Sequence, residues 1–400
     1  MAASRLRRVG RGLRLVVVLI LVAVAARILW CGYGPHDPDV GAQVRFLDAA
    51  VDDGAGESMQ QLFPEGEYFL LVLSGLAAPA DDELTEPQQV TVMTERLERI
   101  GQSEVSAPFA GSAGTEHGAF YHGWTLLLEV ERARLSGEQP HRQRVREQAE
   151  RLADALAEAP SGYLESYAGQ TWPVDNVVAA AALARADELL GLPEVGRTVA
   201  AWPERVAATR DPGTGLLPHQ VDGQGQTLDG PRATSQSLIQ LFWPEIDPDT
   251  APEQWQRFVD TFVDRRAGLV GVREHPKGVD RGGDVDSGPL VLGVSLSATV
   301  VTLGAARAHG DLDLAEDLSR EGELLGLPLQ LAGQRRYAGG VLPVGDAFLA
   351  WARTVPAAEP EVDSGAPAPS WWAWALLPLG LAAVIQVAPR VSRRGTVRSP

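Results

Sequence analysis

Six glycine-bearing turns recur along the middle of the chain at nearly constant spacing. Each turn is polar or aromatic and runs directly into an apolar segment. The marker glycines are Gly66, Gly118, Gly169, Gly230, Gly288 and Gly340. The successive spacings are 52, 51, 61, 58 and 52 residues. A period of this length is typical of one helical hairpin with its two loops. The repeat therefore predicts six consecutive helical hairpins.

Between these turns, apolar residues recur at three- and four-residue spacing, and the alternation typical of strands is scarce. The predicted helices are Gln88–Ile100, Phe120–Leu135, Gln143–Ala157, Val177–Leu190, Val195–Ala208, Ser235–Phe242, Pro252–Val263, Val291–His309, Leu312–Leu325 and Gly345–Thr354. We expect an all-α (α/α)6 toroid, with the helices that follow the marked turns inside and amphipathic helices such as Gln143–Ala157 outside. The turns would then meet at one mouth, over a deep apolar funnel. An open α-solenoid is the alternative.

Two apolar segments flank the repeat. Residues 13–30 are apolar except for Arg14 and Arg27 near the ends, where long side chains can reach the membrane surface, and four arginines precede them. Residues 371–389 carry no charge, begin with tryptophans and are followed by four arginines. Basic flanks favour the cytoplasm. A cleaved signal peptide is the alternative for the first segment.

This pattern predicts a membrane protein whose two ends are cytoplasmic. We expect basic cytoplasmic tails at 1–12 and 390–400, and transmembrane helices at 13–30 (or an uncleaved signal anchor) and 371–389. The extracytoplasmic toroid would span 36–355, followed by a Pro/Ala-rich linker at 356–370.

The middle of the chain is strongly acidic. Ten of the 35 basic residues lie within 1–30 and 389–400, which leaves 25 basic against 52 acidic residues and a formal charge of about −27. Such a body repels nucleic acid, so the expected partners are the lipid bilayer and a small-molecule, lipid or saccharide ligand. A single cysteine, Cys31, excludes an intrachain disulfide and a Cys-based zinc site. Nucleotide-binding, HExxH and GxSxG motifs are missing, so we expect no cofactor and no metal.

Several sequence blocks carry a resemblance. They read FYHGW with LLLEVERARLSG, PVDNVVAAAALARADELLG, DPGTGLLPH, IDPDTAPEQWQRFVDTFV, VREHPKG and QRRYAGG. In these blocks, and in the spacing between them, residues 118–352 resemble the bacterial linalool dehydratase-isomerase family. The resemblance implies an (α/α)6 barrel that acts on a small terpene alcohol.

The side chains that the family uses for catalysis differ here. Trp124 stands where the family has His, Asp175 stands where it has the Cys that precedes Asn176, and no cysteine lies near Glu165. Thiol chemistry is therefore excluded. The resemblance implies a pocket in the same place with different side chains.

Carboxylates dominate the candidate catalytic residues. Asp175 begins an apolar helix, and Glu165 is the nearest acid on the same loop, so the two can act as general acid and base; the alternative is that Asp175 caps its helix. Asp284 and Asp286 lie between glycines in GGDVDSGP, where they suit a polyol or a cation, although a solvated turn explains them equally. His122 is a candidate proton carrier or a packed core residue.

The predicted catalytic residues are thus Asp175, Glu165, His122 and Asp284. Aromatic and polar side chains in or beside the marked turns are the predicted substrate-binding residues: Tyr121, Trp124, Tyr167, Trp172, Asn176, Arg232, Arg273, Glu274, Lys277, Asp286 and Tyr337. Arg273 and Glu274 can also form a structural ion pair.

Together these features predict a membrane-anchored extracytoplasmic enzyme. It would be of lyase, isomerase or hydrolase type and use carboxylate acid/base chemistry on an envelope saccharide or an isoprenoid-type substrate. The alternative is a non-catalytic ligand-binding or scaffold protein with a degenerated site. Convergence of the four candidate catalytic side chains would favour the enzyme.

Overall fold

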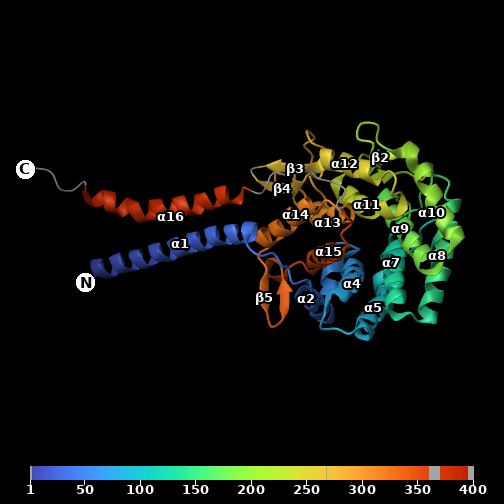
Figure 1. Cartoon of the computed structure of the whole chain (residues 1–400), viewed down its shortest axis with the longest axis horizontal. Helices are drawn as coiled ribbons and strands as arrows, with labels where there is room; N and C mark the ends of the chain where they lie inside the picture. Colours follow the sequence, from blue (N-terminus) through green and yellow to red (C-terminus); the bar gives the residue numbers. More distant parts are fainter. Residues whose placement is uncertain (1, 267, 360–369, 395–400) are drawn as a thin grey trace, which may run out of the picture.

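The computed structural model describes residues 2–266, 268–359 and 370–394, which are mostly helical (Figure 1). The inner layer consists of α4 (Gly66–Ala77), α7 (Gly118–Ser136), α9 (Pro173–Leu190), α11 (Ala233–Ile246), α13 (Leu296–Ala308) and α15 (Pro343–Thr354). The outer layer consists of α2 (Val40–Asp52), α5 (Glu86–Ile100), α8 (Gln139–Glu158), α10 (Pro193–Val206), α12 (Ala251–Phe262) and α14 (Leu312–Leu325). Two short helices, α3 (Ala55–Gln60) and α6 (Ser103–Ser106), lie in connections.

The inner helices form a closed ring. Each packs on the next in the order α4, α7, α9, α11, α13 and α15, and α15 packs back on α4. The outer helix α2 comes first in the chain, yet it packs against α15 as well as α4 and so completes the outer layer at the point of closure. The described ranges therefore form two concentric helical layers, and the open solenoid is not formed.

Sequence features account for the two layers. The inner helix α9 begins with Pro173, which suits a first helical turn, and ends at Gly191 with φ of 63°. Between them it is buried on nearly all sides, as its alanine run requires. In the outer helix α8, by contrast, Val145, Ala149, Leu152 and Leu156 form one buried stripe.

The loops contain β-structure that the sequence did not indicate. Three antiparallel hairpins are formed by β1 (Gln220–Val221) with β2 (Thr227–Asp229), β3 (Val263–Arg266) with β4 (Leu269–Val272), and β5 (Leu329–Leu331) with β6 (Gln334–Arg336). The predicted helix 291–309 begins only at Leu296. Leu292 and Gly293 have positive φ, and the Ser295 hydroxyl caps the helix by accepting from the backbone N–H of Ala298 at 3.2 Å.

The predicted apolar funnel is filled. Trp124 of α7 is fully buried, and its ring lies 5.6 Å from Phe69 of α4, 5.9 Å from Phe242 of α11 and 5.3 Å from Trp351 of α15. This aromatic plug joins four inner helices across the centre of the ring. Trp124, predicted to bind substrate, is therefore a core residue.

Two long helices, α1 (Ala2–Tyr33) and α16 (Trp371–Arg394), leave the ring on one side and pack against each other; we call this pair the stalk (Figure 1). Within α1, residues 11–33 are long and apolar enough to cross a membrane, whereas the apolar part of α16, 371–386, is shorter by the same measure. Helix α1 also includes most of the predicted tail 1–12. The end of the other predicted tail, 395–400, and residues 360–369 of the linker lie outside the described ranges.

Candidate functional site

The loops that precede the inner helices are joined to one another at one end of the ring. The backbone N–H of Ala119 donates to the backbone carbonyl of Glu165 at 2.8 Å. In the same way, the N–H of Val221 donates to the carbonyl of Thr171 at 3.1 Å, and that of Ala233 to the carbonyl of Glu274 at 2.9 Å. These bonds join the loops before α7, α9, α11 and α13 in succession. Glu65, in the loop before α4, acts electrostatically on the phenol of Tyr167.

Gly118 makes this assembly possible. Its φ is 76°, and a Cβ atom at this position would lie 2.2 Å from the carbonyl oxygen of Ser166. Only glycine permits both the left-handed backbone and this close approach of the two loops.

Three carboxylates interact electrostatically at this end of the ring: Glu65 lies before α4, Asp175 in the first turn of α9 and Asp286 in the loop before α13. The charge of Glu65 acts on both aspartates, and that of Asp286 acts on Asp175. Tyr167 lies among them, since all three carboxylates act on its phenol. Burial raises the pKa of Tyr167 well above its ordinary value, and the neighbouring carboxylates add to this effect. Tyr167 is therefore a hydrogen-bond donor at neutral pH. We call these four residues the acidic rim.

Asp175 is the most deeply buried carboxyl of the rim. It lies in the first turn of α9, but the residue at the N-cap position is Trp172, so Asp175 does not cap the helix in the predicted way. The nearby Ser166 hydroxyl bonds the backbone of Trp172, accepting from its N–H at 3.0 Å and donating to its carbonyl at 3.3 Å, and it also acts on the Asp175 carboxyl. Burial raises the pKa of Asp175 to about 7, and the charges of Glu65 and Asp286 act in the same direction, while the Ser166 hydroxyl opposes them. Asp175 can therefore hold a proton near neutral pH.

Asp286 is exposed to solvent, yet the surrounding loops partly desolvate its carboxyl. This desolvation, together with the charges of Asp284 and Glu65, raises the pKa of Asp286 to about 6. The rim thus holds one carboxyl with a pKa of about 6, that of Asp286, and one with a pKa of about 7, that of Asp175.

Arg232 organises the polar groups beside the rim. Its Nε donates to Oε1 of the fully buried Glu274 at 2.7 Å, and its Nη1 lies 2.5 Å from Oδ2 of Asp284. Desolvation opposes ionisation of Asp284, but the hydrogen bond from Arg232 and the backbone N–H of Ser287 lower its pKa to about 2. Asp284 is therefore a fixed anion paired to a fixed cation, which does not suit a proton carrier.

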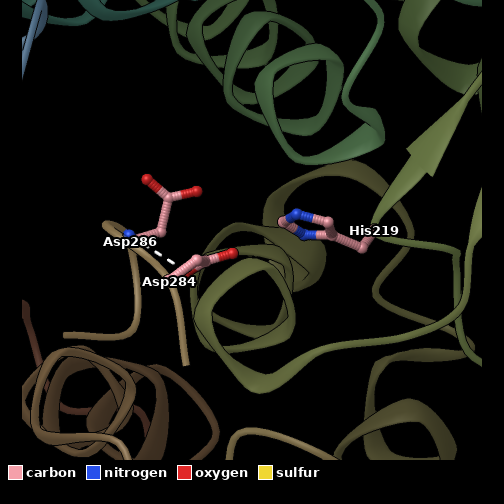
Figure 2. Close-up of side chains that lie close together, drawn as sticks. All are labelled: His219, Asp284 and Asp286. Atoms are coloured by element: carbon pink, nitrogen blue, oxygen red, sulfur yellow. Dashed lines mark hydrogen bonds between the residues drawn. The ribbon is translucent and has the colours of Figure 1, made fainter. Parts of the chain in front are cut away.

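The side chains of His219, Asp284 and Asp286 lie close enough for their ligand atoms to share a cation, all within 4.8 Å of one another (Figure 2). However, Arg232 Nη1 is 3.4 Å from His219 Nε2 as well as 2.5 Å from Asp284. The guanidinium thus already supplies the positive charge at this position. The geometry favours an internal ion-pair network over a metal centre.

We predict that Arg232→Gln will raise the pKa of His219. Burial and the Arg232 charge together lower that pKa to about 4, so removal of the cation should move it upward while burial keeps it below 6.5. Gln can still donate to Glu274. Titration of ¹³C-labelled histidines by NMR measures the shift. His309, whose pKa burial also lowers to about 4 at a distant position, is the control and should not move. An unchanged His219 would contradict this network.

Several predicted site residues organise loops instead of facing the rim. Oε2 of Glu165 accepts from the backbone N–H groups of Ala113 at 2.8 Å and Gly169 at 3.1 Å. The predicted Asp175–Glu165 pair is therefore corrected: the acidic neighbours of Asp175 are Glu65 and Asp286. Asn176 is likewise bonded to the backbone N–H and carbonyl of Leu164, at 2.8 and 3.0 Å.

The two basic residues predicted to hold substrate also bond backbone. Arg273 donates to the carbonyl of Leu292 at 3.1 Å and so pins the loop that carries Asp284 and Asp286. Lys277 donates to the carbonyl of Asp260 at 2.8 Å, at the end of the outer helix α12. Arg273 is thus a positioning residue, and Lys277 lies away from the rim.

His122 and two tyrosines lie elsewhere. Burial lowers the pKa of His122 to about 4, with contributions from His117 and Arg151 rather than from the acidic rim. Tyr121 donates to the carbonyl of Ile100 at 3.3 Å on the outer helix α5. Tyr337 is buried in an ion-pair network with Glu323 and Arg353. None of these contacts involves a residue of the acidic rim.

Tyr167 and Trp172 are the predicted aromatic residues that the structure places at the rim. Their rings meet edge to face at 5.2 Å, and both are partly exposed. Sequence reasoning missed Glu65, Ser166 and His219. Glu65 lies in the first marked turn and His219 ends the DPGTGLLPH block, so both were within motifs already noted.

Two cavities of about 380 and 400 Å³ open elsewhere on the surface. The first lies among α2, α4 and α5 and is lined by Val51, Glu67 and Arg99. The second is lined by Ala184, Glu188 and Ile246, toward the opposite ends of α9 and α11. Neither includes a residue of the acidic rim.

No family model and no curated protein matches the chain. Among solved structures, a D-mannose isomerase is similar with a TM-score of 0.46 and 9% sequence identity, over 83% of this chain and 97% of that one. A polysaccharide lyase is similar with a TM-score of 0.45 and 11% identity, over 84% and 97% of the two chains. At these scores, the ring architecture rests on the helix contacts of this chain itself.

Proposed function

We propose that the protein is an acid/base enzyme that acts on a neutral, hydroxylated substrate at the acidic rim, with Asp175 as general acid and Asp286, assisted by Glu65, as general base. The observation that carries this proposal is that Glu65 and Asp286 both act on Asp175 and on Tyr167, at the end of the ring where the loops before the inner helices are hydrogen-bonded to one another. Pairs of carboxyls in different environments are the usual means of splitting acid and base roles.

The charge balance supports a neutral substrate. The rim and its neighbour Asp284 supply four carboxyls, whereas the nearby cation Arg232 is already paired to Glu274 and Asp284. An anionic substrate would meet repulsion without a free cation to offset it. Tyr167 remains protonated, so a mechanism with a tyrosinate base is disfavoured, and its hydroxyl can instead donate to a substrate oxygen.

The surroundings of the rim suit a saccharide attached to an apolar group. Trp172 offers a partly exposed aromatic face, the kind of surface on which sugar rings stack. The loop that carries Asp286 also exposes Val285, Val291 and Leu292, by 70, 71 and 80%. Apolar side chains this exposed beside an acidic site favour a substrate with both hydroxyl groups and an apolar portion.

In this proposal the stalk anchors the ring in the cell membrane, with the ring outside the cytoplasm. The support is the exposed apolar surface of both helices, including Leu19 and Ile20 of α1 and Leu376 and Leu377 of α16, together with their arginine-rich ends. Where α1 and α16 pack together, Gly32 lies against Trp371, so that an added Cβ atom would be 2.9 Å from its ring, and Ala25, Ala375 and Ala382 on the two helices are also buried. Close approach through small residues is typical of helices that pair in a bilayer.

Turnover of neutral glycosides by the full chain in lipid nanodiscs tests this function. The panel consists of alkyl and p-nitrophenyl glycosides and disaccharides, with products detected by NMR. Asp175→Asn should lower kcat/KM at least about 100-fold, because general acid/base catalysis typically contributes this much. The matched control is Asp346→Asn. Burial also raises the pKa of Asp346 to about 7, but its carboxylate accepts from the backbone N–H of Tyr337 at 2.9 Å, and this variant should keep full activity.

The pH dependence provides a second readout. A protonated Asp175 and an ionised Asp286 are both required, so kcat/KM should peak between about pH 6 and 7 and fall on both sides. Glu65→Gln removes a negative charge that raises the pKa of both Asp175 and Asp286, so both limbs of the profile should move to lower pH. Turnover that survives Asp175→Asn would overturn the mechanism. Binding without turnover across the whole panel would favour the non-catalytic alternative.

A further inference from the structure

The hairpin β5–β6 exposes an apolar surface next to the stalk. Leu329 and Leu331 of β5 are 54 and 67% exposed, and Leu325 and Leu327, which lead into the strand, are 63 and 58% exposed. Soluble surfaces seldom gather large aliphatic side chains in this way. An exposed cluster of this kind is typical of a surface that contacts an apolar partner.

Strand alternation shows that these leucines face away from the protein. Gln330, between Leu329 and Leu331, donates to Oδ2 of Asp39 at 2.7 Å, and the side chains of neighbouring residues in a strand point to opposite sides. Arg335, which pairs with Gln330 across the hairpin, also faces inward, to Glu323 and Tyr337. The outward side thus carries Leu329 and Leu331, with Arg336 opposite Leu329.

The hairpin lies where the stalk meets the ring. It follows directly after α14, and α14 holds the end of α1: Arg320 donates to the carbonyls of Cys31 and Gly34 at 3.1 and 3.0 Å. Arg27, predicted to reach the membrane surface, instead donates to the carbonyl of Glu323 at 2.5 Å. Figure 1 shows β5 at the same end of the ring as the base of α1.

Aromatic side chains mark the level of this junction. Trp30 and Tyr33 at the end of α1 and Trp372 at the start of α16 are 66, 53 and 58% exposed. Tryptophan and tyrosine at the ends of apolar helices characteristically lie at the boundary between bilayer and water. The hairpin follows α14, and α14 is bonded to the end of α1 that carries Trp30 and Tyr33.

We propose that the β5–β6 hairpin rests on the bilayer, with Leu327, Leu329 and Leu331 in the interfacial region and Arg336 within reach of lipid phosphate groups. The hairpin then forms a third membrane contact beside α1 and α16. Two helices packed side by side fix the position of the ring but leave it free to tilt, whereas a third contact away from their axis sets its orientation. This contact goes beyond the proposed catalytic function and does not depend on it.

Spin labels on the full chain measure this directly. In a Cys31→Ser background, a nitroxide is attached at Leu329→Cys, and the protein is placed in nanodiscs of phosphatidylcholine with phosphatidylglycerol. A high collision rate of the nitroxide with oxygen shows that the label lies in lipid. A high collision rate with a water-soluble nickel chelate shows that it lies in water. Leu228→Cys is the matched control, because Leu228 is another exposed leucine (62%) on a two-stranded hairpin, β1–β2. Leu19→Cys in α1 reports the stalk.

The expected result is that labels at 19 and 329 collide more with oxygen and the label at 228 more with nickel. A second label at Leu331→Cys, on the same side of the strand, should agree with 329. The proposal would be overturned if the label at position 329 collided with the nickel chelate as often as the label at position 228 does. So would a label at 329 that neither reagent reaches, since a protein partner would then cover the leucines. A label at 19 that is open to nickel would overturn both this contact and the anchoring role of the stalk.

Discussion

Replacing Asp175 with asparagine should make the protein more stable at pH 8, even though it should abolish acid/base function. The carboxyl is 7% exposed, and burial raises its pKa from 3.8 to about 7. At pH 8 the folded protein must therefore hold a buried negative charge beside two others. A shift of this size corresponds to about 4 kcal/mol at 1.36 kcal/mol per unit, and we expect the variant to gain roughly 2–4 kcal/mol.

The pH dependence of this gain follows from proton linkage. A carboxyl whose pKa is raised on folding stabilises the folded state fully below its unfolded pKa, and this contribution is lost as pH rises through the folded pKa. For Asp175 the loss runs from about pH 4 to about pH 7. The variant should therefore match the native protein near pH 4 and exceed it at pH 8.

Urea unfolding of the full chain in detergent micelles, at pH 4.5 and pH 8, measures the difference. Glu165→Gln is the matched control on the same loop. Its carboxylate accepts from two backbone N–H groups, so its neutralisation should bring no gain at pH 8. Equal or lower stability of Asp175→Asn at pH 8 would show that Asp175 is ionised and paired, and would remove it as the general acid.

This expected gain identifies what the ring contributes to the site. Isolated carboxyls on a flexible surface would separate, hydrate and ionise at their ordinary pKa. Here Gly118 allows two loops to touch, Arg273 pins the loop of Asp286, and helix α9 holds Asp175 in its first turn. The ring thereby keeps like charges together at a cost in stability, which is the usual relation between a strained functional site and its scaffold.

The sequence was sufficient for the architecture because the architecture is periodic. The marked glycines and the apolar spacing predicted the helices and their two layers. The same pattern could not show which carboxyl faces Asp175, because Glu65 lies two helical hairpins away and closure of the ring decides their distance. It also could not separate Asp175 from Glu165: both are loop-borne acids, and only the loop's fold turns Glu165 toward two backbone N–H groups.

The sequence also could not predict the direction in which each candidate side chain points. Arg273, Lys277 and Asn176 have the residue types of a binding site, but each satisfies backbone groups that the long loops would otherwise leave unpaired. Similarly, His122 and Trp124 are two residues apart on one inner helix. The helical period places them on nearly opposite sides, so Trp124 faces the centre of the ring while His122 faces His117.

Replacing Trp124 with alanine should cost about 3–5 kcal/mol of unfolding free energy, because it leaves a cavity at the point where four inner helices meet. Urea unfolding in micelles gives the loss, and Trp124→Phe should recover part of it. Benzene, which binds dry apolar cavities, should stabilise only the alanine variant.

Trp172→Ala is the contrasting variant. It removes a partly exposed ring, so it should cost far less unfolding free energy than Trp124→Ala and should instead raise KM. If Trp124→Ala raises KM with little loss of stability, the centre of the ring is a binding pocket rather than a plug, and the substrate descends past the acidic rim.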